Sequence, residues 1–294
     1  MSTINRRVAL TILAATPLAA TRFLPADEPK SATNDLTVLV MDPLDKELSC
    51  PCVKGYAQRD YDELGKHLAL KLKRPVTVVH SESLVAALKG GKLPAGVDVI
   101  IGKRSVVEFD AKQSQTAVTP IASLTGKDGA TTQFGLIVVP SKDPAKSVAD
   151  LKDYRIIFGP EDCDEKYKAA MAVFKQNGVS LPDKPETCAA CADGATKILE
   201  LGSGVRAATV ISSYAAPLLE GCGTIQKGDL RVVGKTAAVP FVTAFTTGRV
   251  ADSARDSIRE ILIDLIETPK LCAALETQQG FVALDENVDV AKKK

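Results

Sequence analysis

Tryptophan is absent from this 294-residue sequence, and aromatic residues make up only 4% of it. Aromatic platforms that stack on sugars or bases are therefore scarce. Only two histidines occur, His67 and His80, so the sequence has almost no residues from which to build a multi-histidine metal site or a histidine-based catalytic dyad. Lys and Arg number 37 against 36 Asp and Glu, so no net field attracts nucleic acid or an anionic membrane. The motifs G-x-S-x-G, H-E-x-x-H and the phosphate loop do not occur either, and we expect a protein that is not an enzyme.

The composition is that of an ordinary folded protein. Hydrophobic residues are 45% and charged residues 25% of the chain. Such a chain can bury a full core, which excludes disorder and a miniprotein held by disulfides alone. At roughly 100–200 residues per domain, the length favours two domains.

The N-terminus has the order of an export signal. Arg6 and Arg7 precede an apolar run from Val8 to Ala15, and small residues follow up to Ala20. The run is shorter than the roughly 20 residues of a membrane span, so we expect no stable membrane insertion. We assign residues 1–20 to the signal and residues 21–35 to a flexible leader. The Arg pair resembles a twin-arginine signal, and a plain Sec-type signal is the alternative; either predicts a periplasmic or otherwise exported protein.

The remaining chain alternates strands and helices twice. Apolar β-rich runs and helical periodicities predict an α/β architecture. In the first part, strands are expected at 36–41, 76–79 and 97–102, and helices at 60–73 and 81–91. In the second part, strands are expected at 155–159, 205–211 and 230–235, and helices at 161–178, 194–204 and 212–221. A long and a shorter helix are expected within 251–276.

Two similar units followed by a C-terminal return form the outline of a two-lobed binding protein. We expect residues 36–139 plus 237–294 to form lobe one and residues 140–236 to form lobe two. The connections between the lobes would lie near Val139 and Thr236. A ligand would bind between the lobes, where strand ends and helix N-termini converge.

Four stretches carry a resemblance to a known family. They begin with LVAALKGGKLPAGVDVIIGKRS and SVADLKDYRIIFGPEDCDEKYKAAMAVFKQNGV, and continue with GATKILELGSGVRAATVISSYAAPL and LRVVGKTAAVPFVTAF. In order and spacing the chain resembles the periplasmic solute-binding proteins of phosphate, phosphite and phosphonate ABC transporters. The resemblance implies a type-two periplasmic binding fold, with two mixed, mainly parallel sheets flanked by helices. It also implies capture of a small solute, with an ABC permease as partner. We expect the protein to be a monomer.

The sequence departs from that family where the anion should bind. The family's phosphonate binders carry a Ser-Thr-Ser-Gly run, and this chain has Glu161-Asp162-Cys163-Asp164-Glu165 instead. Each unit pair of like charges 4 Å apart costs about 4 kcal/mol at an effective dielectric near 20. Gly102 and Lys103 replace the family's aromatic residue, and Ser212 replaces an acidic one. We therefore expect an altered site that disfavours simple phosphonates and suits a cationic, metal-bearing or zwitterionic solute.

The candidate ligand residues lie in loops at the predicted carboxyl ends of strands. A cationic pair there can bind an oxyanion, and hydroxyls and carboxylates can add polar contacts. The alternatives are a solvated surface pair for Lys103 and Arg104, an edge histidine for His80, and helix capping for the serines. The candidates are His80, Lys103, Arg104, Ser105, Asp162, Cys163, Asp164, Ser212 and Ser213.

The sequence contains seven cysteines, and five of them fall in the predicted ligand-side loops. Thiolates suit Cu(I), zinc or iron–sulfur clusters, so a soft transition metal is a candidate cofactor and a metallochaperone an alternative function. Structural disulfides, such as Cys163 with Cys188 or Cys191, are the competing interpretation in an exported protein. A thiol oxidoreductase is a third class. The candidate metal ligands are Cys50, Cys52, Cys163, Cys188 and Cys191.

Overall fold

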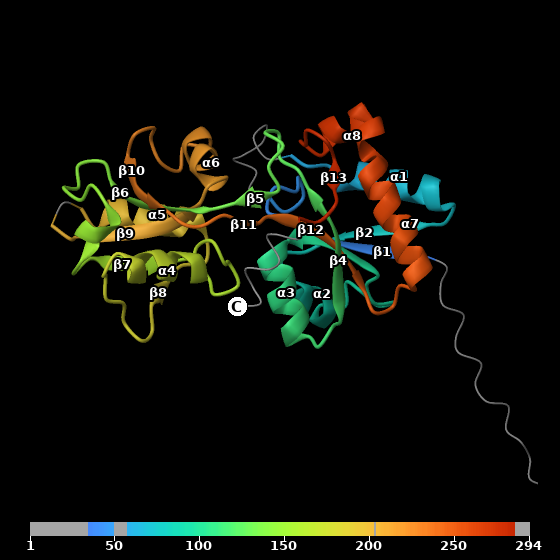
Figure 1. The fold of residues 1–294 in the computed structure, drawn as a ribbon, viewed down its shortest axis with the longest axis horizontal. Coiled ribbons are helices and arrows are strands. Elements are labelled where there is room, and N and C mark those ends of the chain that lie inside the picture. Colours follow the sequence, from blue (N-terminus) through green and yellow to red (C-terminus); the bar gives the residue numbers. More distant parts are fainter. Residues whose placement is uncertain (1–34, 50–57, 203, 286–294) are drawn as a thin grey trace, which may run out of the picture. The chain divides into compact units, whose positions relative to one another are not determined.

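The computed structural model describes residues 35–49, 58–202 and 204–285 (Figure 1). The predicted signal, most of the predicted leader, Cys50 and Cys52 lie outside these ranges. No helix in the described ranges is long and apolar enough to cross a membrane.

A six-stranded sheet contains the N-terminal and the C-terminal strands of the described chain. Its strand order is β13-β4-β12-β3-β1-β2. Strand β1 runs parallel to β2 and β3, whereas β12 runs antiparallel to β3 and β4, and β13 antiparallel to β4. The strands are β1 (Leu36–Met41), β2 (Val76–His80), β3 (Val99–Lys103), β4 (Val118–Leu124), β12 (Val242–Thr247) and β13 (Phe281–Val282).

A five-stranded sheet is built from the middle of the chain. Its order is β10-β6-β9-β7-β8. Strand β7 runs parallel to β8 and β9, and β6 runs antiparallel to β9 and β10. The strands are β6 (Gly135–Pro140), β7 (Arg155–Phe158), β8 (Glu186–Thr187), β9 (Ala207–Ser212) and β10 (Leu230–Lys235). The two mixed sheets confirm the predicted α/β class.

Two short strands connect these sheets. Strands β5 (Thr132–Gln133) and β11 (Val239–Pro240) pair antiparallel with each other (Figure 1). Gln133 is 2% exposed, and neither polar atom of its side chain has a hydrogen-bond partner within the described ranges. Strand β6 already belongs to the five-stranded sheet, so the chain crosses between sheets before Val139, near which the sequence places the connection.

The helices lie close to the predicted ranges, with two differences. Helix α3 (Arg104–Gln113) was not expected from the sequence. Its buried face includes the polar residues Arg104, Ser105 and Asp110, so the sequence shows no continuous apolar stripe at helical spacing. Helix α4 (Lys168–Gln176) begins later than predicted, since the acidic segment before it forms turns. The others are α1 (Tyr61–Leu72), α2 (Leu84–Lys89), α5 (Cys191–Glu200), α6 (Ala215–Gly221), α7 (Asp252–Ile263) and α8 (Pro269–Ala274), with 3-10 turns η2 (Val148–Leu151) and η3 (Asp264–Glu267).

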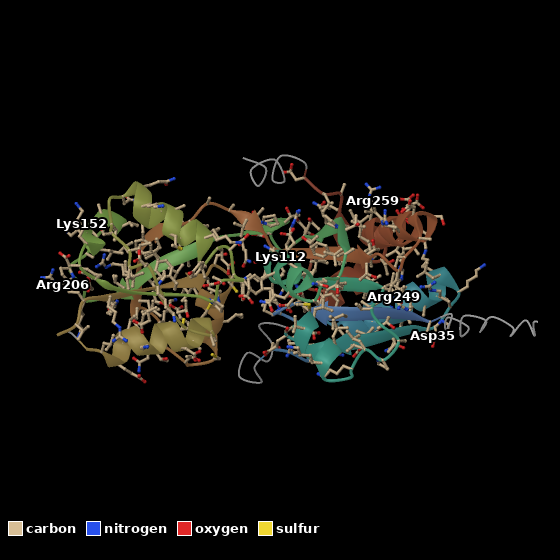
Figure 2. The ribbon with its side chains drawn as sticks, turned by 90° about the horizontal axis from the view of Figure 1, so that it is seen from below. Asp35, Lys112, Lys152, Arg206, Arg249 and Arg259 are labelled. Atoms are coloured by element: carbon tan, nitrogen blue, oxygen red, sulfur yellow. The ribbon has the colours of Figure 1, made fainter. Side chains whose placement is uncertain are left out.

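Both sheets are buried on both faces. Along β1, Val38 and Val40 enter one apolar cluster and Leu39 enters another, as the two-residue period of a strand requires. Strand β6 divides in the same way, with Ile137 on one side and Leu136 on the other. Exposed charged side chains such as Lys112, Lys152, Arg206 and Arg259 extend away from this apolar interior (Figure 2). Because the faces are covered, strand ends and loops are the places where a ligand can bind.

Candidate functional site

Loops from both sheets line one cavity of about 540 Å³. The six-stranded sheet and its connections contribute Met41, Pro43, Leu48, Val106 and Lys103. The five-stranded sheet and its connections contribute two groups of residues. One follows β7, and the other lies around the starts of α5 and α6. A cavity of this size, mostly apolar with a few charged groups, has the character of a small-molecule site.

A buried ion pair lies at this cavity and joins the two sheets. The ammonium of Lys103, at the end of β3, donates to Oε1 of Glu165 at 2.6 Å, and the two side chains are 4% and 0% exposed. The hydroxyl of Ser212 donates to the same oxygen at 2.5 Å. Burial opposes the ionisation of Glu165, but the nearby Lys103 outweighs it and holds the pKa of Glu165 below its ordinary value. The charge of Lys103 is therefore already compensated.

A second buried lysine, Lys166, also lines the cavity. It is 5% exposed, and its carbon chain lies against Gly159, where an added Cβ would come within 2.7 Å of Lys166 Cε. Within the described ranges its ammonium makes neither a hydrogen bond nor an ion pair. Burial disfavours the charge of Lys166, whereas attraction to Cys191 and Cys163, when these thiols are ionised, raises its pKa above the ordinary value. Lys166 is thus a buried amine that lines the cavity.

The sequence did not identify Lys166 as a candidate. The acidic run from Glu161 to Glu165 drew attention to repulsion, and Lys166 follows it directly. A signal was present, because Gly159 ends the strand and leaves room for a long side chain beside the backbone. The sequence alone could not show that Glu165 turns to Lys103 while Lys166 turns to the cavity.

The acidic residues of this run separate in the structure. Asp162 lines the cavity, and its Oδ1 is fully shielded from solvent without a hydrogen-bond partner among the described residues. Asp164 turns away and forms an ion pair with Lys168 at 2.9 Å. Its backbone N–H donates to Ser105 Oγ at 3.3 Å. The run is therefore not a single patch of negative charge.

The remaining polar candidates do not line the cavity. Arg104 forms an ion pair with Glu108 at 2.8 Å along helix α3. Ser213 Oγ accepts a hydrogen bond from the Phe134 N–H at 3.3 Å. These residues, with Ser105 and Ser212, connect the segments that surround the cavity.

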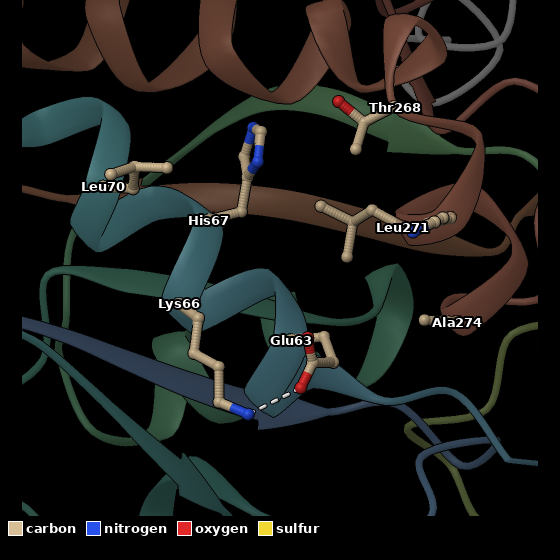
Figure 3. A pocket seen from close by; sticks show the side chains of 8 residues that line it. Glu63, Lys66, His67, Leu70, Thr268, Leu271 and Ala274 are labelled. Atoms are coloured by element: carbon tan, nitrogen blue, oxygen red, sulfur yellow. Dashed lines mark hydrogen bonds and ion pairs between the residues drawn. The ribbon is translucent and has the colours of Figure 1, made fainter.

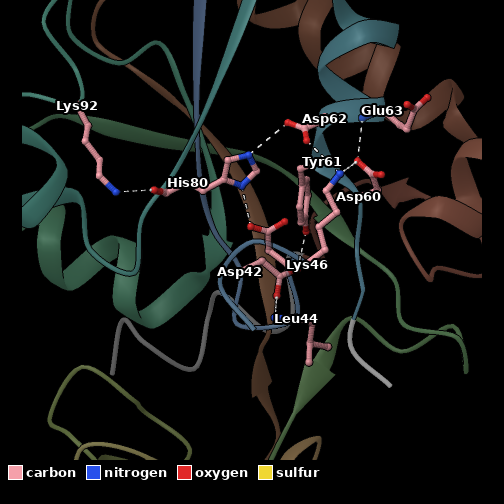
Figure 4. Close-up of polar contacts among 10 residues, drawn as sticks. Asp42, Leu44, Lys46, Asp60, Tyr61, Asp62, Glu63, His80 and Lys92 are labelled. Carbon is pink, nitrogen blue, oxygen red and sulfur yellow. Dashed lines mark hydrogen bonds and ion pairs between the residues drawn. The ribbon is translucent and has the colours of Figure 1, made fainter. Parts of the chain in front are cut away.

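His80 belongs to a separate polar network (Figure 4). Its Nδ1 lies 2.7 Å from Asp45 Oδ2, and its Nε2 lies 3.3 Å from Asp62 Oδ1. Lys92 donates to the backbone carbonyl of His80 at 3.2 Å. His80 does not line the cavity, and its ring contacts Asp45 in the loop after β1.

That loop follows strand β1 and is held by Asp42. Arg59 donates to Asp42 Oδ2 at 2.8 Å, and the Tyr61 hydroxyl donates to the same oxygen at 2.5 Å. The other oxygen of Asp42 accepts from the Leu44 N–H at 2.9 Å. The fixed loop presents Pro43, Leu48 and Ser49 to the cavity.

Several thiols surround the cavity, and Cys163, Cys191 and Cys222 line it. Cys191 Sγ accepts from the Ser212 N–H at 3.3 Å, while Cys188 Sγ donates to the Phe158 carbonyl at 3.3 Å. Burial raises the pKa of Cys163 to about 11, so it is a neutral thiol at neutral pH. Cys163, Cys188 and Cys191 form no disulfide.

A metal site is not found within 35–49, 58–202 and 204–285. No group of three or more His, Cys, Asp or Glu side chains is placed there to hold an ion. The candidate ligands Cys50 and Cys52 lie outside the described residues. Metal binding therefore stays a prediction.

A smaller surface pocket of about 270 Å³ lies between helix α1 and the segment Thr268–Ala274, which contains α8 (Figure 3). It is lined by His67, Leu70 and Leu271, and Lys66 pairs with Glu63 at 2.6 Å on its edge. Leu70 is 75% exposed. None of the predicted ligand residues reaches this pocket, so the larger cavity is the candidate site.

Solved structures share this fold at low sequence identity. XAC2383 from Xanthomonas citri, solved with ATP, is 13% identical with a TM-score of 0.65, over 87% of this chain and 94% of that chain. A binding protein component of an ABC phosphonate transporter from Pseudomonas aeruginosa is 14% identical, with a TM-score of 0.63 over 89% and 85% of the two chains. PhnD1 from Prochlorococcus marinus, in complex with methylphosphonate, is 13% identical, with a TM-score of 0.62 over 88% and 97%.

Sequence comparison agrees with the fold. No curated protein matches this sequence. A family model, that of the periplasmic substrate-binding protein of phosphonate ABC transporters, matches residues 55–288. The matched region contains most of the segments that line the cavity, including those that carry Lys103, Glu165 and Lys166. Since the match extends over far more than half of the chain, this protein belongs to the periplasmic substrate-binding family of phosphonate ABC transporters.

Proposed function

We propose that this protein captures a small organic solute in the cavity between its two sheets, anchors an anionic group of that solute on Lys166, and presents it to an ABC permease. No bond is made or broken in this function. The observation that carries the proposal is the buried ammonium of Lys166, which lines the cavity without a partner among the described residues. A buried charge without a partner is costly, and a ligand of opposite charge removes that penalty.

The same geometry supports an altered site. Lys103 is compensated by Glu165, and the carboxylates of Asp162 and Glu82 also line the cavity. A doubly charged phosphonate would meet one uncompensated lysine and two carboxylates. We therefore propose that simple phosphonates bind weakly and that a singly charged acid with an apolar body binds better.

Equilibrium titration of the purified protein with hexanoate and methylphosphonate tests this proposal. Lys166→Met keeps much of the side-chain volume and removes the charge. Hydrogen bonds to charged groups are worth about 1.5–3 kcal/mol, so this variant should lose roughly 10- to 100-fold in hexanoate affinity. Lys168→Met is the matched control, because Lys168 is 69% exposed and pairs with Asp164. Unchanged hexanoate affinity in Lys166→Met, or tight methylphosphonate binding, contradicts the proposal.

Capture by closure requires movement of one sheet unit against the other. We propose that the unit built on the six-stranded sheet and the unit built on the five-stranded sheet, which begins with β6, move as lobes. The ligand would stabilise the closed state through its higher affinity for that state. Small-angle scattering with and without ligand measures this change. An identical radius of gyration in both conditions contradicts closure.

Export is part of the proposed function. Residues 1–20 would act as the signal, and the mature monomer would work in the periplasm. Cell fractionation and N-terminal sequencing test this, and full-length protein in the cytoplasm contradicts it. Replacing Arg6 and Arg7 by lysine separates the twin-arginine route, which should fail, from the Sec route, which should continue.

A soft metal as cargo or cofactor is a second candidate. The observation that favours it is the position of Cys163, Cys191 and Cys222 on the cavity wall. These thiols alone do not form a metal-holding group in the described ranges, so further ligands would have to come from outside them. Metal analysis of protein purified under reducing conditions, with Cys163→Ser as comparison, tests this candidate.

A further inference from the structure

Two opposite charges face the same cavity from the segment between β7 and α4. The ammonium of Lys166 and the carboxylate of Asp162 both line it. The Asp162 Oδ1 is fully shielded from solvent, and Lys166 is 5% exposed. Neither group has a partner among the described residues, and the two do not pair with each other.

Lys166 and Asp162 both lack a compensating charge or hydrogen bond from the described residues of the protein. Removing a carboxylate or an ammonium from water costs several kcal/mol unless a counter-charge or hydrogen bonds compensate it. Asp162 is half-buried, and a ligand with only an acid group would satisfy Lys166 but would leave the shielded Oδ1 of Asp162 without a hydrogen-bond donor. A ligand that carries both an acid group and an ammonium satisfies both protein groups at once.

The rest of the cavity restricts the ligand further. Since Lys103 is neutralised by Glu165, Lys166 alone offers a positive charge among the described lining residues, which matches one negative charge on the acid. Met41, Val106 and Leu218 contribute apolar surface to the same cavity. An apolar side chain on the ligand gains free energy by leaving water there.

We infer that the ligand is a small zwitterion with a singly charged acid group at Lys166, an ammonium at Asp162 and an apolar side chain against Met41, Val106 and Leu218. The inference rests on the proposed function and names its substrate class. An amino acid with an unbranched apolar side chain has this chemistry.

Norleucine and three analogues form the test set. Hexanoate lacks the ammonium, n-pentylamine lacks the acid group, and 1-aminopentylphosphonate replaces the carboxylate by a phosphonate. Isothermal titration of the wild-type protein should give norleucine at least 10-fold higher affinity than hexanoate and than n-pentylamine. The phosphonate analogue should bind more weakly than norleucine, because its second negative charge has no uncompensated lysine.

Two variants separate the charges. Asp162→Asn should remove the preference for norleucine over hexanoate, whereas Lys166→Met should weaken both. Asp183→Asn is the control, since Asp183 is exposed and lies outside the cavity. Thermal unfolding of each variant checks that it folds, and a ligand-induced shift in melting temperature provides a second readout.

The outcomes distinguish the inference from the function on which it rests. If norleucine and hexanoate bind with equal affinity and Asp162→Asn changes neither, the ligand is not a zwitterion. The proposal that Lys166 binds an acid group would still hold. If 1-aminopentylphosphonate binds more tightly than norleucine, the inference that the acid group of the ligand carries a single negative charge is wrong. If none of these probes binds and Lys166→Met behaves like wild type, both the inference and the proposed function fail.

Discussion

Lys103 and Glu165, 62 positions apart in the sequence, meet at 2.6 Å in a buried ion pair that joins β3 of the six-stranded sheet to the turn segment after β7. Ser212 adds a hydroxyl to the same carboxylate oxygen, and Glu165 Oε2 has no partner within the described ranges. Glu165 therefore compensates the charge of Lys103, and the pair connects segments of the two sheets.

Breaking this pair on one side should destabilise the protein strongly. Lys103→Met leaves the carboxylate of Glu165 buried without its counter-charge, and removing one partner of a buried pair typically costs about 3–5 kcal/mol. The double variant Lys103→Met with Glu165→Met should recover most of that free energy of unfolding. Urea denaturation measures it. A single variant within about 1 kcal/mol of wild type would show that the pair is exposed to water in solution.

Stability should depend on pH through His80. Hydrogen bonding to Asp45 raises the pKa of His80, burial opposes this, and Asp62 adds to it. The pKa of Asp45 is raised as well, because burial outweighs its pairing with His80, whereas Lys46 lowers the pKa of Asp62. A raised histidine pKa stabilises the fold fully below the unfolded value of about 6.5, and the stabilisation is lost as pH rises through the folded value.

The comparison of wild type with His80→Asn measures this contribution. The difference in free energy of unfolding should be largest below about pH 6.5 and should shrink towards alkaline pH. NMR titration provides the direct check. His67 is the only other histidine, and burial and then Lys71 lower its pKa. His80 should therefore titrate at higher pH than His67, and the reverse order would contradict the network in Figure 4.

Gly159 should be required for the position of Lys166. A Cβ at residue 159 would lie 2.6 Å from Lys166 Cβ and 2.7 Å from Lys166 Cε, which is closer than real contacts allow. Gly159→Ala should cost about 1–3 kcal/mol of stability and should weaken hexanoate or norleucine binding by displacing the ammonium. Gly204→Ala is the control, because nothing lies within 4 Å of its added Cβ. Equal behaviour of the two variants in titration and melting would contradict this role.

Tyr61→Phe tests the support of the cavity loop. The Tyr61 hydroxyl donates to the buried carboxylate of Asp42 at 2.5 Å, and a hydrogen bond to a charged group contributes about 1.5–3 kcal/mol. Tyr154→Phe removes a similar bond, to Asp143 at 2.9 Å, in a more exposed place and should cost less. Denaturation of both variants gives the comparison. Ligand affinity should fall only in Tyr61→Phe, because that loop carries Pro43 and Leu48 into the cavity.

The sequence was informative where periodicity and order determine structure. The strand Leu36–Met41, a continuous β-rich run, and the helix Tyr61–Leu72 follow from local patterns. It was less informative where contacts of buried polar residues determine the local structure. Helix α3 was missed because Arg104 and Asp110 are buried in it, and a local pattern cannot show that distant groups pair with them.

The candidate site shows the same division. The loops were predicted from topology, and Lys103, Asp162 and Cys163 do line the cavity. The direction in which each charge turns depends on contacts between segments far apart in the sequence, such as Lys103 with Glu165. For this reason the acidic run was read as one repulsive patch, although Asp164 pairs with Lys168 and Glu165 with Lys103.

Gln133 places an energetic cost in the connection between the sheets. Its two polar side-chain atoms are buried in the short ladder between β5 and β11, without hydrogen-bond partners among the residues that the structure describes. A buried polar group left without a hydrogen bond costs about 1–3 kcal/mol, and any arrangement that exposes this amide to water avoids that cost. Each 1.4 kcal/mol shifts a two-state equilibrium by about tenfold. If the two sheet units close on a ligand, binding would have to offset this cost at Gln133 in the connection between the sheets.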